Sequence, residues 1–391
     1  MAEGPFDLTQ ATPEKPAVAF KTAPGWIPAA VLLFLAAGVA SFWLLLAGGQ
    51  STRAWQIFLV NFLFWPPLAS AGVAVAAMFE VTKARWPVAV RPLAEACAAY
   101  LPVGLLLFLA SWPGRRTLFP WHADPAPVPA AWLNLPFLYG REAVAWLVLC
   151  AAGLLFVYRS GRGSAAAPAS LARGSPRPLA VALLILYVLV STVFAWDFGM
   201  SIQRGWHSTM FGALFLFESL YAAVAVVTVL TIFINGRWRG GARLSPATCN
   251  NLGKLLLAFS MLWIYLFGSQ YLVIWYGNLP REISFLLARS GAASWRAVFL
   301  ALLALNFVVP FLILLRRASR ENPKILAATG GTIAAGIWVS RFLLVVPALS
   351  PGSPIPLHWP EGLITVGFFA SFLGTILMAL RRMPALAPKG G

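Results

Sequence analysis

The chain has 391 residues, of which 60% are hydrophobic and only 10% are charged, and its mean hydropathy is +0.78. This composition excludes an ordinary soluble globular protein and indicates that lipid surrounds most of the chain. The formal net charge of +17 does not indicate nucleic-acid binding, because the 29 Lys and Arg residues lie in short clusters between long apolar runs.

Ten apolar runs are long enough to cross about 30 Å of hydrocarbon as α-helices. The first five predicted spans are residues 26–47, 54–79, 94–112, 137–158 and 178–198. The second five are residues 210–234, 252–275, 295–315, 325–346 and 362–380. The sequence therefore predicts an all-α integral membrane protein with terminal tails at 1–25 and 381–391, five transmembrane helices within 26–198 and five within 199–380.

The distribution of basic residues predicts the orientation, because Lys and Arg accumulate on the cytoplasmic side of a membrane. The two tails and the even-numbered connections carry 20 basic residues, whereas the odd-numbered connections carry 8. Both termini are therefore expected in the cytoplasm.

Two charged residues lie well inside predicted spans. Glu218 is about two turns into the sixth span, with Tyr221 on the same helical face, and Arg341 lies inside the ninth span at a depth that would let it meet Glu218. Buried charge in lipid is costly, so such residues are candidates for a functional site. They predict either a structural ion pair or a proton relay or polar pocket wall.

The hairpin between spans five and six contains Asp197 and His207. An acid and an imidazole near the hydrocarbon boundary are suited to accept protons from a quinol as its electrons leave. The alternative is that Asp197 caps the turn and His207 is merely solvated.

A third group ends the seventh span and includes amides and aromatic residues. Gln270 and Asn278 can hydrogen-bond a quinone carbonyl while Tyr271, Trp275 and Tyr276 flank its ring. The alternative interpretation is an aromatic belt at the membrane interface.

On the predicted cytoplasmic side, Glu80 ends span two, Glu95 lies about one turn inside span three, and Lys254 begins span seven. These residues predict an inward half of a proton path. Alternatively, they are helix-end charges that reach toward water.

The histidines and cysteines show no pattern for a catalytic or metal site. The histidines fall in predicted loops, and the cysteines lie far apart without a CxxC motif; these residues are His122, His207, His358, Cys97, Cys150 and Cys249. No haem held between helices and no iron–sulfur cluster is therefore expected on this chain, so any redox centres would belong to partner subunits.

Three stretches carry a resemblance to a known family: Trp-Leu-Asn-Leu-Pro-Phe at 132–137, Ala-Trp-Asp at 195–197 with Trp-His-Ser-Thr-Met-Phe-Gly at 206–212, and Gln-Tyr-Leu-Val-Ile-Trp-Tyr-Gly-Asn-Leu-Pro at 270–280. In these stretches the chain resembles the NrfD/PsrC-type family of quinol-interacting membrane subunits. Within that family it is similar to the ActF-type subunit of bacterial alternative complex III, a quinol:cytochrome c oxidoreductase.

The resemblance implies two four-helix bundles, spans two to five and six to nine, with one extra helix at each end. It also implies a place in the bacterial cytoplasmic membrane beside a homologous NrfD-like subunit, an iron–sulfur subunit and c-type cytochrome subunits. Those partners would hold the haem c and the iron–sulfur clusters. Quinone or quinol is the one ligand that it suggests for this chain, and it leaves open whether quinol binds here or only in the homologous subunit.

Two other functions remain open on the sequence. Ten spans in two halves with an Arg and a Glu at depth would suit a secondary transporter, although no helices interrupted by Gly or Pro occur at matching positions of the two halves. The sparse polar residues would also permit a purely structural anchor of a respiratory complex.

Overall fold

The computed structural model describes residues 19–20, 26–84, 86–122, 131–162, 176–203, 205–234, 238–239, 244–356 and 358–382. In this part of the chain ten helices are long and apolar enough to cross a membrane. The prediction of an all-α chain is confirmed, and the number of these helices equals the number of predicted spans. Most of the tails predicted at 1–25 and 381–391 lies outside the described residues.

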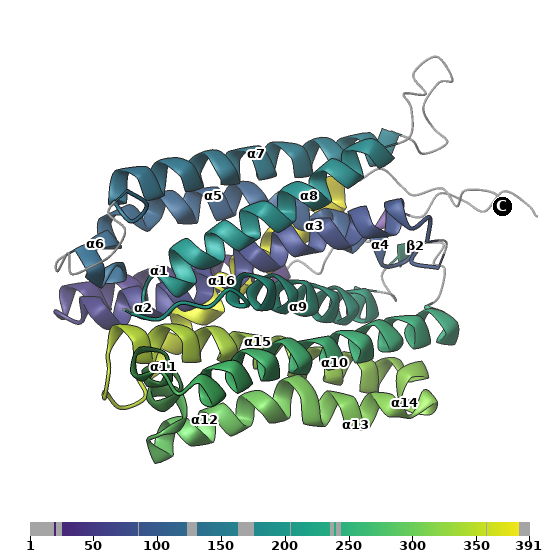
Figure 1. Cartoon of the computed structure of the whole chain (residues 1–391). Coiled ribbons are helices and arrows are strands. Elements are labelled where there is room, and N and C mark those ends of the chain that lie inside the picture. The colour runs from purple at the N-terminus through teal and green to yellow at the C-terminus, as the bar shows by residue number, and fades with distance from the viewer. Residues whose placement is uncertain are drawn as a thin grey trace, which may run out of the picture.

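The first five spans contain both continuous and interrupted helices (Figure 1). Three short elements follow the third span: η2 (Trp112–Gly114), α6 (Arg115–Leu118) and η3 (Pro120–His122). The spans in chain order are α1 (Trp26–Ala47); α2 (Ser51–Phe62) with α3 (Trp65–Val81); α4 (Arg91–Ala96) with η1 (Cys97–Tyr100) and α5 (Leu101–Ala110); α7 (Leu135–Arg162); and α8 (Arg177–Phe194) with η5 (Ala195–Met200).

Most of the second five spans extend a few residues beyond their predicted bounds, and a helix that was not predicted lies between the seventh and eighth spans. The seventh begins at Pro246 rather than at residue 252, and the predicted connection after it contains α11 (Pro280–Ser290). The short α14 (Arg317–Glu321) precedes the ninth span. The spans are α9 (Phe211–Ile234); α10 (Pro246–Gly277); α12 (Ala293–Leu303) with η7 (Ala304–Val308) and α13 (Val309–Leu315); α15 (Pro323–Leu349); and α16 (Trp359–Arg382).

Prolines account for the break in the second span. Pro66 and Pro67 have no backbone N–H to donate and their rings clash with the preceding turn, so α2 ends at Phe62 and α3 begins at Trp65. The fifth and eighth spans instead contain the π-helical segments η5 and η7. Such segments insert an extra residue into a helix, re-aim its side chains and often mark functional sites.

The core lies around α3 and α9. Helix α3 packs against α8 and α9, and α9 packs in turn against α10 and α15, while α7 lies beyond α8 and α13 lies beyond α10 (Figure 1). In an apolar 18-residue stretch of the second span 94% of the residues are buried within the chain, whereas in the corresponding stretch of the first span only 17% are. The second span is therefore a central element, and the first faces its surroundings.

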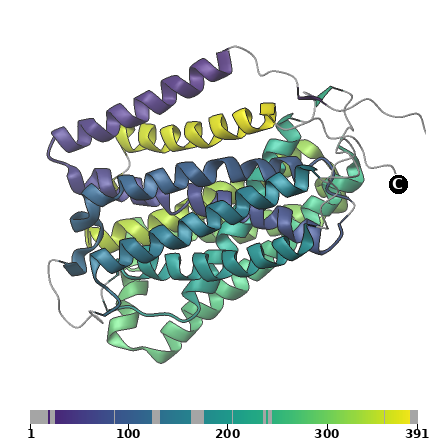
Figure 2. The same cartoon turned by 90° about the horizontal axis from the view of Figure 1, so that it is seen from above.

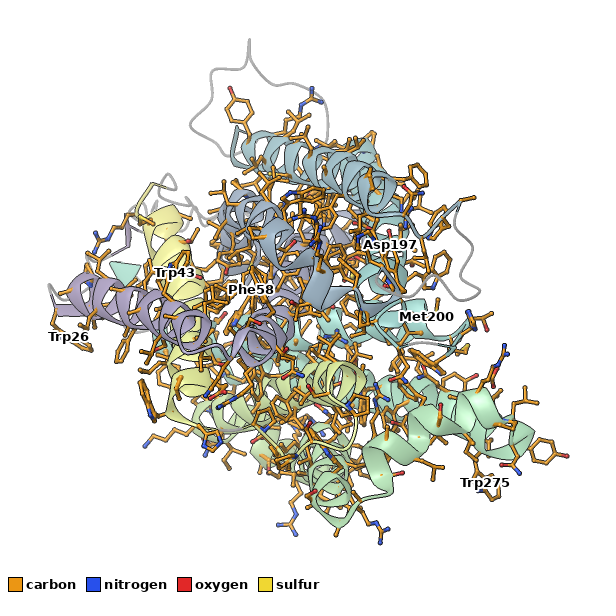
Figure 3. The ribbon with its side chains drawn as sticks, turned by 90° about the vertical axis from the view of Figure 1, so that its left-hand side faces the viewer. Trp26, Trp43, Phe58, Asp197, Met200 and Trp275 are labelled. Atoms are coloured by element: carbon orange, nitrogen blue, oxygen red, sulfur yellow. The ribbon has the colours of Figure 1, made fainter. Side chains whose placement is uncertain are left out.

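Helices α1 and α16 form a pair at one edge of the molecule (Figure 2). They approach closely at two glycines, since a Cβ atom on Gly38 would lie 2.9 Å from the Cα atom of Gly367. Small residues at such crossings let helix backbones meet in an apolar medium. The opposite face of α1 exposes Trp26 and Trp43 (Figure 3), as expected of a lipid-facing helix.

A two-residue antiparallel pair joins distant parts of the sequence. Strand β1 (Ala19–Phe20) pairs with β2 (Trp238–Arg239), which lies in the connection between the sixth and seventh spans. The segment before the first span and this connection therefore lie at the same end of the helices, as an even number of crossings between them requires.

We expect the Gly38→Val substitution to lower the midpoint of thermal unfolding, because the added side chain has no room against Gly367 and overpacking costs about 1–3 kcal/mol. The matched control is Gly140→Val, since a Cβ atom at Gly140 meets nothing within 4 Å. Thermal unfolding of both variants in detergent measures the difference. Equal midpoints for the two variants would contradict the close α1–α16 packing.

Candidate functional site

The two charges predicted to lie at depth meet in the interior. Arg341 on α15 donates from Nη1 to Glu218 Oε2 on α9 at 2.5 Å, and the two residues are only 1% and 2% exposed. The Arg341 guanidinium also lies 3.8 Å from the centre of the Phe215 ring. Burying an isolated charge costs several kcal/mol, so each of these two residues offsets the cost of burying the other.

Two further side chains hydrogen-bond the Glu218 carboxylate. Trp263 Nε1 on α10 donates to Glu218 Oε1 at 3.0 Å, and the Ser340 hydroxyl donates to the same oxygen at 2.8 Å. Glu218 thus connects α9, α10 and α15. Hydrogen bonds of this kind stabilise the ionised carboxylate and fix its orientation.

A small cavity adjoins this ion pair. It has a volume of about 40 Å³, and besides the ion pair its lining includes Gln270, Tyr271 and Arg289. We call it the Glu218 cavity. Gln270 and Tyr271, two of the predicted ring-binding residues, are thus brought together with Glu218 and Arg341, although the residues come from different spans.

Arg289 is a second buried cation at the Glu218 cavity, only 2% exposed. Its guanidinium donates to Phe285 O and Leu344 O, each at 2.9 Å, and more weakly to Gln203 Oε1 at 3.3 and 3.4 Å. Burial lowers the pKa of Arg289 from its usual value to about 10, so the side chain remains a cation at neutral pH.

Aromatic stacking fixes this arginine. The Arg289 guanidinium lies 3.7 Å from the centre of the Phe285 ring, whose other neighbour is Trp206, stacked at 3.9 Å with an interplanar angle of 9°. Cation–π and stacking contacts of this kind are strongest where water is excluded. Trp206 and Phe285 thereby join the loop before α9 to α11.

The remaining residues of the predicted ring-binding group do not line the Glu218 cavity. Trp275 and Tyr276 are 66% and 85% exposed, and Trp275 points away from the helices in Figure 3. Asn278 is the left-handed cap at the end of α10. Tyr221 points to the eighth span, where its hydroxyl donates to Asn306 O in η7 at 3.1 Å.

His207 lies apart from the Glu218 cavity, in a second and larger depression. This depression has a volume of about 380 Å³ and is also lined by Gly205, Arg281 and Glu282. We call it the His207 hollow. His207 itself is exposed, so its surroundings differ from those of the buried ion pair.

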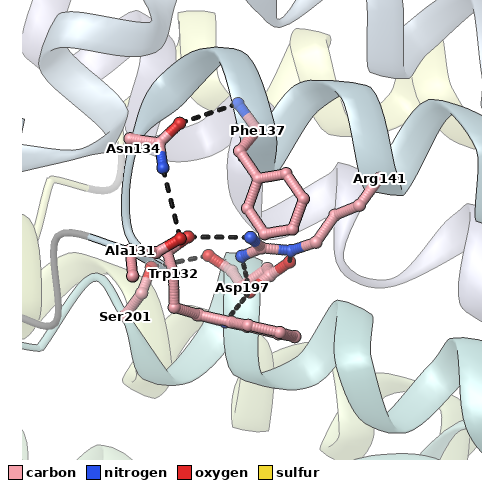
Figure 4. A network of polar contacts seen from close by, with 7 residues as sticks. All are labelled: Ala131, Trp132, Asn134, Phe137, Arg141, Asp197 and Ser201. Atoms are coloured by element: carbon pink, nitrogen blue, oxygen red, sulfur yellow. Dashed lines mark hydrogen bonds and ion pairs between the residues drawn. The ribbon is translucent and has the colours of Figure 1, made fainter.

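Asp197 forms a separate network with Arg141 and Trp132 (Figure 4). Arg141 donates from Nη2 to Asp197 Oδ1 at 2.6 Å and from Nε to Oδ2 at 2.7 Å, while Trp132 Nε1 donates to Oδ1 at 3.2 Å. The Arg141 guanidinium lies over the Trp132 ring at 4.0 Å and the Phe137 ring at 4.8 Å. Asp197 is fully buried in η5, so this two-pronged ion pair ties η5 to the start of α7.

Glu142 follows Arg141 on α7 and is also fully buried. Both of its carboxyl oxygens are without a hydrogen-bond partner among the described residues. Neither Arg141 nor Glu142 is in the predicted site. Glu218 was selected because it is a charged residue inside a predicted span. Arg141 and Glu142 meet the same criterion, because both lie inside the predicted fourth span.

The residues predicted for an inward proton path divide into two places. Arg91 links Glu80 and Glu95 through hydrogen bonds of 2.8 Å to each, and Ser160 donates to Glu95 at 2.7 Å. Lys254 is exposed on α10 and has no ion pair among the described residues. The two glutamates therefore form a cluster, and its role in proton transfer remains a prediction.

Sequence reasoning missed Arg289 because it treated residues 276–294 as a connection. A helix start was nevertheless readable there, since Pro280 stands at the first helical position with Glu282 in the first turn. No sequence signal placed Arg289 at the same cavity as Glu218, because its position there depends on how α11 packs against α15.

No known family model matches the chain, and no curated protein matches it significantly.

We expect the Arg341→Met substitution to lower the free energy of unfolding by about 3–5 kcal/mol, because it leaves the Glu218 carboxylate buried without its cation. The double variant Glu218→Leu with Arg341→Met should lose less than the sum of the two single variants. A double-mutant cycle by detergent-induced unfolding measures this coupling. Additive effects would contradict the direct ion pair.

Arg141→Lys should lower the free energy of unfolding by about 1–2 kcal/mol, since an ammonium group cannot make the two-pronged contact with Asp197 or the flat stack on Trp132. Arg115→Lys is the control, because Arg115 also lies over a tryptophan, Trp112, at 4.3 Å and donates to its carbonyl oxygen. Thermal unfolding compares them. An Arg141→Lys variant no less stable than the control would rule out a special role for this contact.

Proposed function

We propose that this chain is a membrane subunit of a quinol-oxidising respiratory complex of the NrfD/PsrC type, similar to the ActF-type subunit of alternative complex III. The observation that carries the proposal is the Glu218 cavity, where an ion pair, a second cation and an amide meet inside apolar helices. Charged groups at such depth are retained for a functional reason far more often than uncharged ones.

The dimensions of the site favour a proton path over a quinone pocket. Pockets for ring-containing ligands occupy about 300–1,000 Å³, whereas the Glu218 cavity has about 40 Å³. A cavity of that volume is large enough for water, since each water needs roughly 10–15 Å³. Glu218, which lines this cavity together with Tyr271, is therefore the proposed proton-carrying group.

A quinol headgroup, where this subunit binds one, fits the His207 hollow better. That hollow has about 380 Å³ and places an exposed imidazole beside the available space. The oxidation of a quinol releases protons, and an imidazole is a suitable general base to receive them. Asp197 belongs to the separate Arg141 network, for which we propose a role in holding the subunit together.

The proposed architecture has two four-helix bundles, spans two to five and six to nine, with α1 and α16 outside them. Its support is the packing of α3 on α8 and of α9 on α10 and α15, together with the separate α1–α16 pair. Both termini are proposed to lie in the cytoplasm, on the side that carries 20 of the basic residues. The membrane is proposed to be the bacterial cytoplasmic membrane.

The proposed partners supply the redox centres. They are a homologous NrfD-like membrane subunit, an iron–sulfur subunit and c-type cytochrome subunits. The exposed apolar faces, such as those of α1 and α12, offer surfaces for lipid and for the membrane partner.

Purification from the native membrane in mild detergent tests the proposal. We expect c-type haem and an iron–sulfur protein to accompany the chain, visible in the absorption spectrum and the subunit composition. A colourless protein without partners would contradict the proposal and would favour a transporter.

In the purified complex, we expect Glu218→Gln to lower quinol:cytochrome c turnover at least about tenfold, equivalent to about 1.4 kcal/mol in the barrier, because an amide cannot carry the proton. The control is Glu321→Gln, whose carboxylate pairs with Arg317 near the surface. The haem content of both preparations must equal that of the wild type. Unchanged turnover with Glu218→Gln would exclude Glu218 from the proton path.

A further inference from the structure

The charges at the Glu218 cavity do not balance. Two buried guanidinium groups, those of Arg289 and Arg341, line it, whereas Glu218 is the only carboxylate among its described lining residues. Arg341 is paired with Glu218, but Arg289 makes no ion pair with any described carboxylate. Its hydrogen bonds go to neutral oxygens of Phe285, Leu344 and Gln203.

A buried charge without a counter-charge costs several kcal/mol. Neutral carbonyl oxygens offset a part of that cost, and the Phe285 ring offsets another part. A ligand of charge −1 beside Arg289 would neutralise the remaining charge. The electrostatics of the cavity thus select for an anion.

Hydrogen-bond donors are available at the same place. Nε of Arg289 and Nε of Arg341 are both buried without a partner among the described residues. In each case both Nη atoms donate hydrogen bonds to the protein, whereas the Nε–H has no partner among the described residues. Unsatisfied buried donors are rare in folded proteins, and each calls for a partner such as an ion or water.

The size of the cavity restricts the anion. About 40 Å³ accommodates a monatomic ion together with roughly one water, but no carboxylated or phosphorylated organic molecule. Gln270 Oε1 is also buried without a hydrogen-bond partner among the described residues and can accept a hydrogen bond from such a water.

We propose that the Glu218 cavity binds one small monovalent inorganic anion, of which chloride is the prototype, between the guanidinium groups of Arg289 and Arg341. The anion compensates the charge of Arg289 and leaves Glu218 paired with Arg341. Its binding does not depend on a quinol or on the proposed respiratory partners.

The surrounding segments suggest a route for the ion. Trp206 stacks on Phe285, which lines the Glu218 cavity, and the chain neighbours of Trp206, Gly205 and His207, line the His207 hollow. One pair of aromatic rings therefore links the lining segments of the two spaces.

The first experiment measures binding of radioactive chloride to the purified full-length protein at neutral pH by a scintillation proximity assay. We expect saturable binding of about one chloride per chain, displaced by unlabelled bromide and not by gluconate, which is too large for the cavity. Absence of saturable binding to the wild-type protein would overturn the proposal whatever the behaviour of any variant.

The second experiment identifies the site through variants. Arg289→Gln should bind chloride at least about tenfold more weakly, and Arg296→Gln, which removes an exposed arginine on the neighbouring helix α12, should bind as the wild type does. Should Arg289→Gln not fold, Gln270→Glu provides the second variant, because a carboxylate there repels the anion. Binding that survives in the folded variant at either position would contradict the site.

Thermal unfolding supplies an independent readout. At equal ionic strength of about 150 mM, chloride should raise the midpoint of the wild type by at least about 2 °C over gluconate, since a ligand that binds only the folded state stabilises it. Arg296→Gln should retain this difference. Equal midpoints in the two salts for the wild type would count against the anion. Failure of the respiratory partners to co-purify would leave these results unaffected.

Discussion

An ion pair in an apolar interior constrains this molecule more than any other contact. Glu218 and Arg341 lie on helices α9 and α15, where lipid and apolar side chains leave no water to solvate a lone charge. The two helices must therefore meet at this depth and in this rotation. Trp263 and Ser340 add hydrogen bonds to the same carboxylate, which extends the constraint to α10. The ion pair and hydrogen bonds of Glu218 thus constrain how α9 packs against α10 and α15.

The need to pair a buried charge also explains the Asp197–Arg141 network. The two networks nevertheless differ in their surroundings. Asp197 is as deeply buried as Glu218, but its partner Arg141 is held between two aromatic rings close to the start of α7. The π-helical segment η5 turns Asp197 toward that partner, at the cost of a regular helix. This network pairs both carboxylate oxygens of Asp197 with Arg141, although the buried carboxyl of the neighbouring Glu142 has no hydrogen-bond partner among the described residues. It ties elements together, whereas the Glu218 cavity has unpaired donors, a second cation and space.

The three stretches that carry the family resemblance come together in space. Trp132 and Asp197 share the Arg141 network, while Phe211 lines the Glu218 cavity with Gln270 and Tyr271. Trp206 reaches from the middle stretch to Phe285 on α11. These contacts place the three stretches beside the two buried ion pairs. The proposed proton path and the proposed anion site share this region and depend on different residues of it, Glu218 for the first and Arg289 for the second.

The sequence by itself determined the ten candidate spans. The thickness of the hydrocarbon layer sets a minimum length for a membrane-crossing apolar helix, and apolar runs of that length can be read directly from the sequence. It also determined that Glu218 and Arg341 carry special weight, since charge inside a span is visible without a structure. It missed Arg141 and Glu142 near the edge of the fourth span, and it treated the helix containing Arg289 as a connection. Only the tertiary structure decided that Gln270 and Tyr271 face the cavity while Trp275, Tyr276 and Asn278 do not. The physical reason is that hydropathy reports how deep a residue lies, whereas the facing of side chains depends on helix rotation and on contacts between distant segments.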